Sequence, residues 1–279
     1  MSIHEDVSYP SYEPNFLGDD HGIALPTGPV DVVQANLTHF SVLYRKDKKI
    51  AWLCAANINR ALQKSKNRKK EDYYEKDDIT KDDQYNNNWY YGGPGGSGDL
   101  YDKGHMARRE TVRWGSTDAE AHQAEDDSFY WINIAPHHQG VHHDEWKIVE
   151  DAILKLIDQD AEGTKATVMT GSHFGSPPNP LDNMWGSPND PATREIPTAF
   201  FKLLFYVDKN DHELKGLCFW VPHTPITWTT EQTAGQPERI KGTPAQFFLI
   251  DKATLQVRMG LQGINDWPKF NMLPGGATL

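Results

Sequence analysis

Residues that could carry acid–base chemistry on a phosphate ester gather in the segment from Tyr101 to Glu150. It opens with the tetrapeptide DKGH at 102–105, and Arg108 and Arg109 follow shortly after. A neutral imidazole can accept a proton near pH 7, and nearby cations suit an anionic phosphodiester. The tetrapeptide alone is a weak signal, because a turn with a hydrogen-bonded histidine contains the same residues.

The second half of this segment adds Asn133, His142 and Glu150, and the last two lie eight residues apart. Apolar residues at spacings of three and four predict an amphipathic helix over residues 144–158. Eight residues are little more than two helical turns, so His142 and Glu150 are expected to share one face. An imidazole and a carboxylate on one face can hold a divalent ion directly and through water.

Three further histidines crowd the same stretch, namely His137, His138 and His143. We expect at most one or two of them to contact a metal ion and the others to be polar loop residues. An alternative is a histidine-rich, zinc-stabilised structural protein. No pair of Cys or His residues in this stretch has the closed four-ligand spacing of a structural zinc site, which argues against that alternative.

These motifs resemble the DNA/RNA non-specific endonucleases, a family of the His-Me finger (ββα-metal) superfamily. The family sequence contains DRGH, then N-I-x-P-Q, then N-Q-x-x-W-x-x-L-E, and this chain has DKGH at 102–105, NIAPH at 133–137 and HHDEWKIVE at 142–150 with unchanged spacing after Asn133. Flanking segments extend the resemblance over most of the chain: PNFLG at 14–18, HFSVLY at 39–44, MTGSHF at 169–174 and IPTAFFK at 196–202.

The resemblance implies a metal-dependent, sugar-non-specific endonuclease that hydrolyses DNA and RNA to 5′-phosphate products without a covalent enzyme intermediate. By position, His105 matches the general base that deprotonates the attacking water. Asn133 matches an amide that helps to hold the base and its surroundings, and Glu150 matches the carboxylate that orders the water shell of the metal. Lys103 stands where the family has arginine, so it keeps the charge but loses the planar two-pronged contact with a phosphate.

The resemblance also implies one divalent metal ion, with His142 as its protein ligand. The family has asparagine at this position, and a histidine nitrogen is a softer ligand than an amide oxygen. The resemblance implies Mg²⁺, and the histidine makes Mn²⁺ and Zn²⁺ the alternatives. Arg108 is expected to contact substrate phosphate, as is Arg68, our candidate for a family arginine upstream of the DKGH segment.

The order of the predicted strands and helix around these residues indicates an α+β fold on an antiparallel sheet, with a ββα-metal active-site motif. The β-prone runs His39–Tyr44 and Ile50–Ala56 predict one hairpin, Phe201–Val207 with Gly216–Val221 predict a second, and Thr167–Thr170 predict a further strand. Residues 84–98 and 172–198 are predicted to be long irregular loops. We expect residues 1–36 to form an extended arm packed on a single nuclease domain of residues 37–279.

Composition limits the classes of protein that fit. The chain of 279 residues has a net charge of −11, which argues against a protein that coats nucleic acid; the basic run at 64–70 is typical of a solvated face. No apolar run approaches the roughly 18 residues that span a bilayer, and no signal pattern precedes the domain, so we expect no membrane partner and a cytoplasmic protein, with delivery as a toxin left open. Cys54 and Cys218 lie in apolar runs and are predicted to be unpaired.

The expected partners are DNA and RNA as substrates. Members of the family often form homodimers, and no segment here marks such an interface. The rival hypothesis is a degenerate family member that binds nucleic acid or a partner protein without cutting it, because two site positions, Lys103 and His142, differ from the usual residues. The presence of His105, Asn133 and Glu150 in register argues against that rival.

Overall fold

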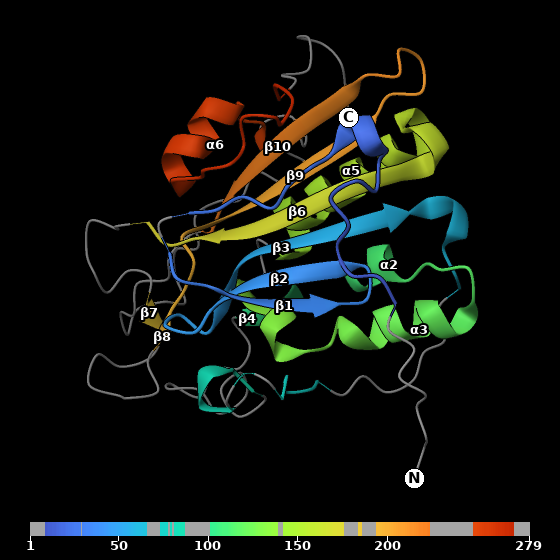
Figure 1. Cartoon of the computed structure of the whole chain (residues 1–279). Coiled ribbons are helices and arrows are strands. Elements are labelled where there is room, and N and C mark those ends of the chain that lie inside the picture. Colours follow the sequence, from blue (N-terminus) through green and yellow to red (C-terminus); the bar gives the residue numbers. More distant parts are fainter. Residues whose placement is uncertain are drawn as a thin grey trace.

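A six-stranded antiparallel sheet with strand order β1-β2-β3-β6-β9-β10 forms the centre of the protein (Figure 1). The computed structural model describes residues 9–28, 30–65, 73–77, 79, 81–86, 101–138, 142–175, 184–185, 194–223 and 248–270. The strands of this sheet are β1 (Val33–Leu37), β2 (Phe40–Arg45), β3 (Ile50–Asn59), β6 (Lys165–His173), β9 (Ala199–Val207) and β10 (Leu214–Pro222). The sheet confirms the predicted α+β class with an antiparallel core.

Both predicted hairpins are present, as β2–β3 and β9–β10, and the predicted strand at 167–170 is the centre of β6. β1 begins at Val33, so the sheet includes residues that the sequence places in the N-terminal arm. Its alternation of exposed and buried side chains is short and interrupted by polar residues, which is why periodicity does not reveal it. The inner strands are buried on both faces, since every residue of β3 and of β9 is buried.

Two hydrophobic cores cover the two faces of the sheet. One core joins the sheet to helix α5 (Lys147–Asp160) and to the small hairpin of β4 (Tyr101–His105) and β5 (Ile134–His138). The other joins it to α6 (Lys252–Met259) and to the N-terminal segment through Tyr12 and Ile23. In Figure 1, α6 lies in front of the sheet and α5 lies behind it. The candidate site is therefore carried by the face that bears α5.

The predicted amphipathic helix is confirmed as α5, which is preceded by a π-helical turn, η5 (His142–Trp146). The helices α2 (Arg109–Val112), α3 (Asp118–Asp127) and α6 were not predicted. The sequence of α3, DAEAHQAEDD, has too few apolar residues for a periodic pattern, and capping starts the helix instead, because Thr117 Oγ1 accepts a hydrogen bond from the Glu120 backbone N–H at 3.2 Å.

The remaining short elements are 3₁₀ turns and a two-stranded ladder. The turns are η1 (Asp19–His21), η2 (Arg60–Leu62), η3 (Lys81–Asp83), η4 (Trp131–Asn133) and η6 (Glu162–Thr164), and the ladder pairs β7 (Met184–Trp185) with β8 (Arg194–Glu195). The ladder falls within the predicted loop at 172–198, most of which lies outside the described residues, as does most of the predicted loop at 84–98.

Cys54 and Cys218 are buried and unpaired, as the sequence predicts. Among the described residues, no helix is both long enough and apolar enough to cross a membrane.

Shortening a core side chain should destabilise the sheet. Leu204 in β9 is fully buried in the core that carries α5, so we expect Leu204→Ala to lower the free energy of unfolding by about 2–5 kcal/mol through lost contacts and a cavity. Val257 on α6 is 84% exposed, and Val257→Ala should leave the free energy of unfolding nearly unchanged. Urea unfolding followed by circular dichroism measures both; equal effects would contradict the assigned core.

Candidate active site

The β4–β5 hairpin divides the DKGH segment between two faces. Asp102 lies opposite His137 in the ladder, and His105 lies opposite Ile134. Because successive strand residues point to opposite faces, Lys103 and His105 share one face, and Asp102 and Gly104 share the other. The hairpin thus presents the predicted base on one face and a carboxylate on the other.

His105 has the properties of a proton acceptor. Its ring packs edge-on against Phe129, with centroids 5.2 Å apart, and its Nε2 is buried with no hydrogen-bond partner among the described residues. Burial lowers the pKa of His105 to about 4, with the charge of Glu150 opposing the shift and that of His142 adding to it. The imidazole is therefore neutral at pH 7, and it lies within the electrostatic influence of both Glu150 and His142.

Asn133 holds the chain that follows the base. Its Oδ1 accepts a hydrogen bond from the Ala107 backbone N–H at 2.8 Å, and its Nδ2 donates to the carbonyls of Ala107 at 3.0 Å and Ser128 at 2.8 Å. Its own backbone carbonyl accepts from the Met106 N–H at 2.8 Å. Because this fully buried amide is bound to the backbone through both its oxygen and its nitrogen, it positions the turn after His105.

His142 forms a hydrogen bond with the carboxylate of the hairpin. Its Nδ1 donates to Asp102 Oδ2 at 2.8 Å, which leaves the lone pair on Nε2, the tautomer of a histidine whose second nitrogen binds a metal ion. In a regular α-helix, eight residues would place His142 and Glu150 roughly 80° apart around the axis. The π-helical turn contains one extra residue, which reduces this offset to roughly 20° and brings the two residues onto one line along the helix.

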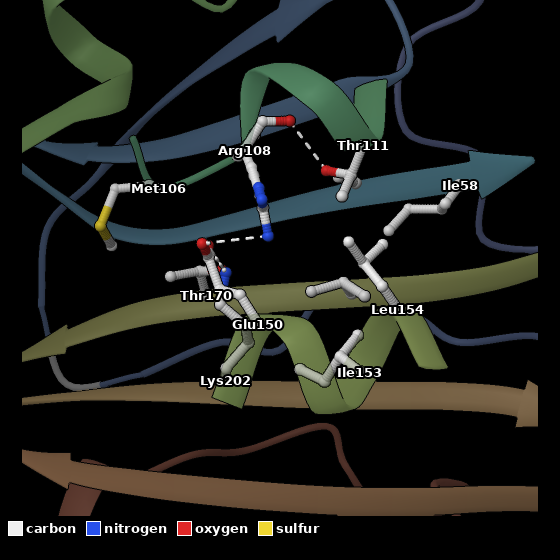
Figure 2. Close-up of a pocket in the computed structure, with 12 residues that line it drawn as sticks. Ile58, Met106, Arg108, Thr111, Glu150, Ile153, Leu154, Thr170 and Lys202 are labelled. Carbon is white, nitrogen blue, oxygen red and sulfur yellow. Dashed lines mark hydrogen bonds and ion pairs between the residues drawn. The ribbon is translucent and has the colours of Figure 1, made fainter. Parts of the chain in front are cut away.

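Glu150 lies between two cations. Its Oε1 accepts a hydrogen bond from Lys202 Nζ at 2.9 Å, and its Oε2 lies 3.4 Å from Arg108 Nη1 (Figure 2). Burial alone would raise the pKa of Glu150, but the charges of Lys202 and Arg108 outweigh burial and lower it, so the carboxylate is ionised. The three charged groups lie in a narrow pocket whose walls are mostly apolar: Ala56, Ile58, Met106, Ala107, Thr111, Ile153, Leu154, Val168 and Thr170.

Lys202 is a site residue that the sequence did not single out. It lies in β9, its side chain is 4% exposed, and its Nζ stands 4.6 Å from the centroid of the Trp146 ring. The sequence does contain one sign of its role, a lysine within the otherwise apolar run AFFKLLFYV. A lysine is almost never fully buried unless it is paired, so this position predicts a buried anionic partner. Its partner Glu150 lies 52 residues away in sequence, which explains why no local pattern links them.

His137 fills the space that Gly104 leaves open. A Cβ at Gly104 would lie 2.3 Å from the His137 ring, so any other residue there would displace the imidazole. The His137 ring also packs against Phe200 and Trp146, with centroids 4.3 Å and 5.2 Å away. Burial lowers the pKa of His137 well below its ordinary value, and both ring nitrogens lack a hydrogen-bond partner among the described residues. A buried donor left in this state costs about 1–3 kcal/mol.

The predicted cations occupy different positions. Lys103 Nζ lies 4.4 Å from the centroid of the Tyr73 ring, on the face of the hairpin that bears His105. Arg108 pairs with Glu110 at 3.0 Å as well as with Glu150. Arg68 lies outside the described residues, and its predicted contact with phosphate stays a prediction.

These donors fit a divalent ion held by few protein ligands. The described part of the chain contains no group of three or more His, Cys, Asp and Glu residues that could enclose a metal, which disfavours a closed zinc site there. His142, oriented by Asp102, suits an open site whose remaining positions belong to water and phosphate oxygens, and the ring of His137 lies beside that of His142. Glu150 is held by Lys202 and Arg108 and is therefore placed to act on water or on these cations.

Comparison with known proteins identifies the family. Residues 23–259 match the DNA/RNA non-specific endonuclease family, and the chain belongs to it, as the motifs predict. Members of this family generally use a divalent metal ion. The crystal structure of the EndoG/EndoGI complex contains a chain with the same fold: the TM-score is 0.63 at 18% identity, covering 84% of this chain and 86% of that one.

One curated relative is 30% identical over 191 residues, the uncharacterized protein y4fB of Sinorhizobium fredii. The match covers 66% of this chain and 26% of the relative, so the chain spans about a quarter of the length of that protein.

The buried ion pair gives a test of the site's construction. Lys202→Met should destabilise the protein by about 3 kcal/mol, because Glu150 loses the closer of its two cations while remaining buried. Adding Glu150→Gln to Lys202→Met should recover part of that loss, since the unpaired charge is removed. A double-mutant cycle of urea unfolding energies measures the coupling, and strictly additive effects would contradict the pairing.

The pKa values of the two imidazoles His105 and His212 should be shifted in opposite directions. Burial lowers the pKa of His105 to about 4, whereas a hydrogen bond with Glu162 raises the pKa of the exposed His212 above its ordinary value. At pH 5.5 His105 should therefore be neutral and His212 protonated. Histidine side-chain NMR between pH 5 and 8 measures this: the His105 resonances should stay constant, and a midpoint near 6.5 would show that the site is hydrated.

Proposed function

We propose that this chain is a metal-dependent, sugar-non-specific endonuclease that hydrolyses phosphodiester bonds of DNA and RNA to 5′-phosphate products, with His105 as its general base. One observation carries the proposal: the neutral His105 has a buried Nε2 without a hydrogen-bond partner among the described residues, in the motif and register that the family uses. An imidazole in this state can take a proton from water, which most buried histidines cannot because their nitrogens are already engaged.

The residues around His105 support this step by holding it in place. Asn133 fixes the backbone of Ala107, so the strand that ends at His105 cannot swing away from the site. When the oxygen of water bonds to phosphorus and the P–O3′ bond breaks, the proton of that water moves to the neutral imidazole of His105, and the electrostatic influence of the ionised Glu150 favours the resulting imidazolium. Positioning by rigid elements of this kind is a large part of the rate advantage of such sites.

The cations bind the substrate phosphate. Arg108 Nη1 is buried and lies 3.4 Å from Glu150, yet it makes no hydrogen bond within the described part of the chain. A phosphate oxygen can accept from this nitrogen without breaking an existing hydrogen bond. Lys202 keeps Glu150 ionised and anchored while Arg108 turns to the phosphate. The overall charge of −11 suits an enzyme that must release its product, and the pocket itself brings together the cations Arg108 and Lys202.

Within this proposal His142 holds a single divalent ion, Mg²⁺ or, because the ligand is a nitrogen, Mn²⁺ or Zn²⁺. Bound there, the ion would supply positive charge to the scissile phosphate and to the leaving 3′ oxygen. We also propose that the substrates are DNA and RNA and that the chain can pair as a homodimer.

Replacing the base should strongly slow cleavage. Purified protein incubated with plasmid DNA and with RNA, separately in Mg²⁺, Mn²⁺ and Zn²⁺, should cut both substrates, and His105→Ala should lower kcat at least about a hundredfold because general-base catalysis is lost. The matched control is His122→Ala, a change of an exposed histidine on α3, which should cleave at the wild-type rate.

Gel electrophoresis with end-group analysis follows the products, and unfolding curves verify that the variants are folded. Nucleic acid that stays intact under every metal while still shifting in a binding gel would reject the enzyme and favour a binding-only family member. Cleavage that His105→Ala does not reduce would move the base to another residue.

A further inference from the structure

His137 and His142 face each other at the end of the β4–β5 hairpin. Their ring centroids are 5.4 Å apart with planes at 82°. Two imidazoles that bind the same tetrahedral ion through nitrogens at about 2 Å have centroids roughly 5 Å apart. The two rings are therefore already at the separation that a shared ion requires, and Asp102 is hydrogen-bonded to Nδ1 of His142.

The surroundings of His137 provide a cavity for its ring and no partner for its nitrogens. Gly104 leaves room for the ring, while the rings of Trp146 and Phe200 pack against it. The residue is 1% exposed, and neither nitrogen has a hydrogen-bond partner among the described residues. Buried polar side chains nearly always have a partner, so the position calls for a group that the described part of the chain does not supply.

The sequence shows the same pairing. The family pattern has an amide side chain at both positions: the glutamine that ends N-I-x-P-Q and the first asparagine of N-Q-x-x-W-x-x-L-E. This chain has an imidazole at both positions, His137 and His142. These two positions are five residues apart along the chain, on either side of the end of β5, and their rings are neighbours in the structure. Together they change the donor set from oxygen to nitrogen.

We propose that His137 is a second protein ligand of the divalent ion held at His142, so that this chain selects a nitrogen-preferring ion such as Zn²⁺ or Co²⁺ over Mg²⁺. The inference rests on the proposed function in one respect, the assignment of His142 to the metal. Imidazole nitrogens suit Zn²⁺ and Co²⁺, whereas Mg²⁺ prefers oxygen ligands and keeps several waters. With two protein ligands, the remaining positions are left to water and to a phosphate oxygen.

Metal binding tests this proposal without any measurement of cleavage. Full-length protein stripped with a chelator is titrated with Co²⁺ alone and with Mg²⁺ alone, followed by calorimetry and by the visible absorption of Co²⁺. The variants are His137→Gln and His142→Asn, which restore the family residues, and His122→Gln, an exposed histidine on α3 as the matched control. The two site variants should each weaken Co²⁺ binding at least about tenfold and reduce the Co²⁺ absorption, while Mg²⁺ binding changes far less and the control matches wild type.

The outcomes separate this inference from the proposed function. Wild-type Co²⁺ affinity in His137→Gln, with weakened binding in His142→Asn, would reject His137 as a ligand and leave the proposed function intact. No effect in either variant would place the ion elsewhere and overturn both assignments of ligands. Tenfold losses in both variants in a protein that leaves DNA and RNA uncut would keep this inference and reject the nuclease.

A second measurement covers the case in which His137→Gln does not fold, which circular dichroism would reveal. X-ray absorption of the zinc-loaded wild-type chain counts imidazole ligands directly. Two imidazoles per zinc are expected, and one would overturn the proposal.

Discussion

The contact between Glu150 and Lys202 connects the parts from which the site is built. Lys202 belongs to strand β9 of the main sheet, Glu150 to helix α5, and Arg108, on the other side of the carboxylate, follows β4. Isolated charges at this depth would be strongly destabilising, and each is tolerated because its partners are in place. These contacts thereby hold the helix, the hairpin and the sheet in fixed positions relative to one another, and the proposed chemistry needs that arrangement.

The β4–β5 hairpin is also held by contacts between different elements, here between neutral groups. Gly104 is required because the His137 ring occupies the place of its missing Cβ, and Asn133 is required because its amide satisfies the backbone on both sides of Ala107. Neither residue needs to touch substrate to be indispensable. The DKGH motif is thus partly a packing requirement. Its glycine makes room for the ring of His137 on the neighbouring strand, and its histidine is the proposed base.

Sequence patterns predicted much of this structure because many of its elements are locally encoded. Alternating and continuous apolar runs gave β2, β3, β9 and β10, and the three- and four-residue spacing gave α5. The patterns missed α3, whose helix is set by a cap and not by an apolar face, and β1, whose burial pattern is too short. They also missed the π-helical turn at His142, since an inserted residue changes the helical phase without changing the composition.

The sequence by itself determined the antiparallel class of the sheet and the identity of His105, Asn133, His142 and Glu150 as the residues to examine, because each lies in a short segment of fixed spacing. Only the tertiary structure decided that Lys202 holds Glu150 and that the His137 ring lies against His142. The physical reason is that contacts between elements depend on strand register and on the phase of a helix, which no single segment specifies. The neutrality of His105 belongs to the same class, since burial lowers its pKa and burial is a property of the assembled fold.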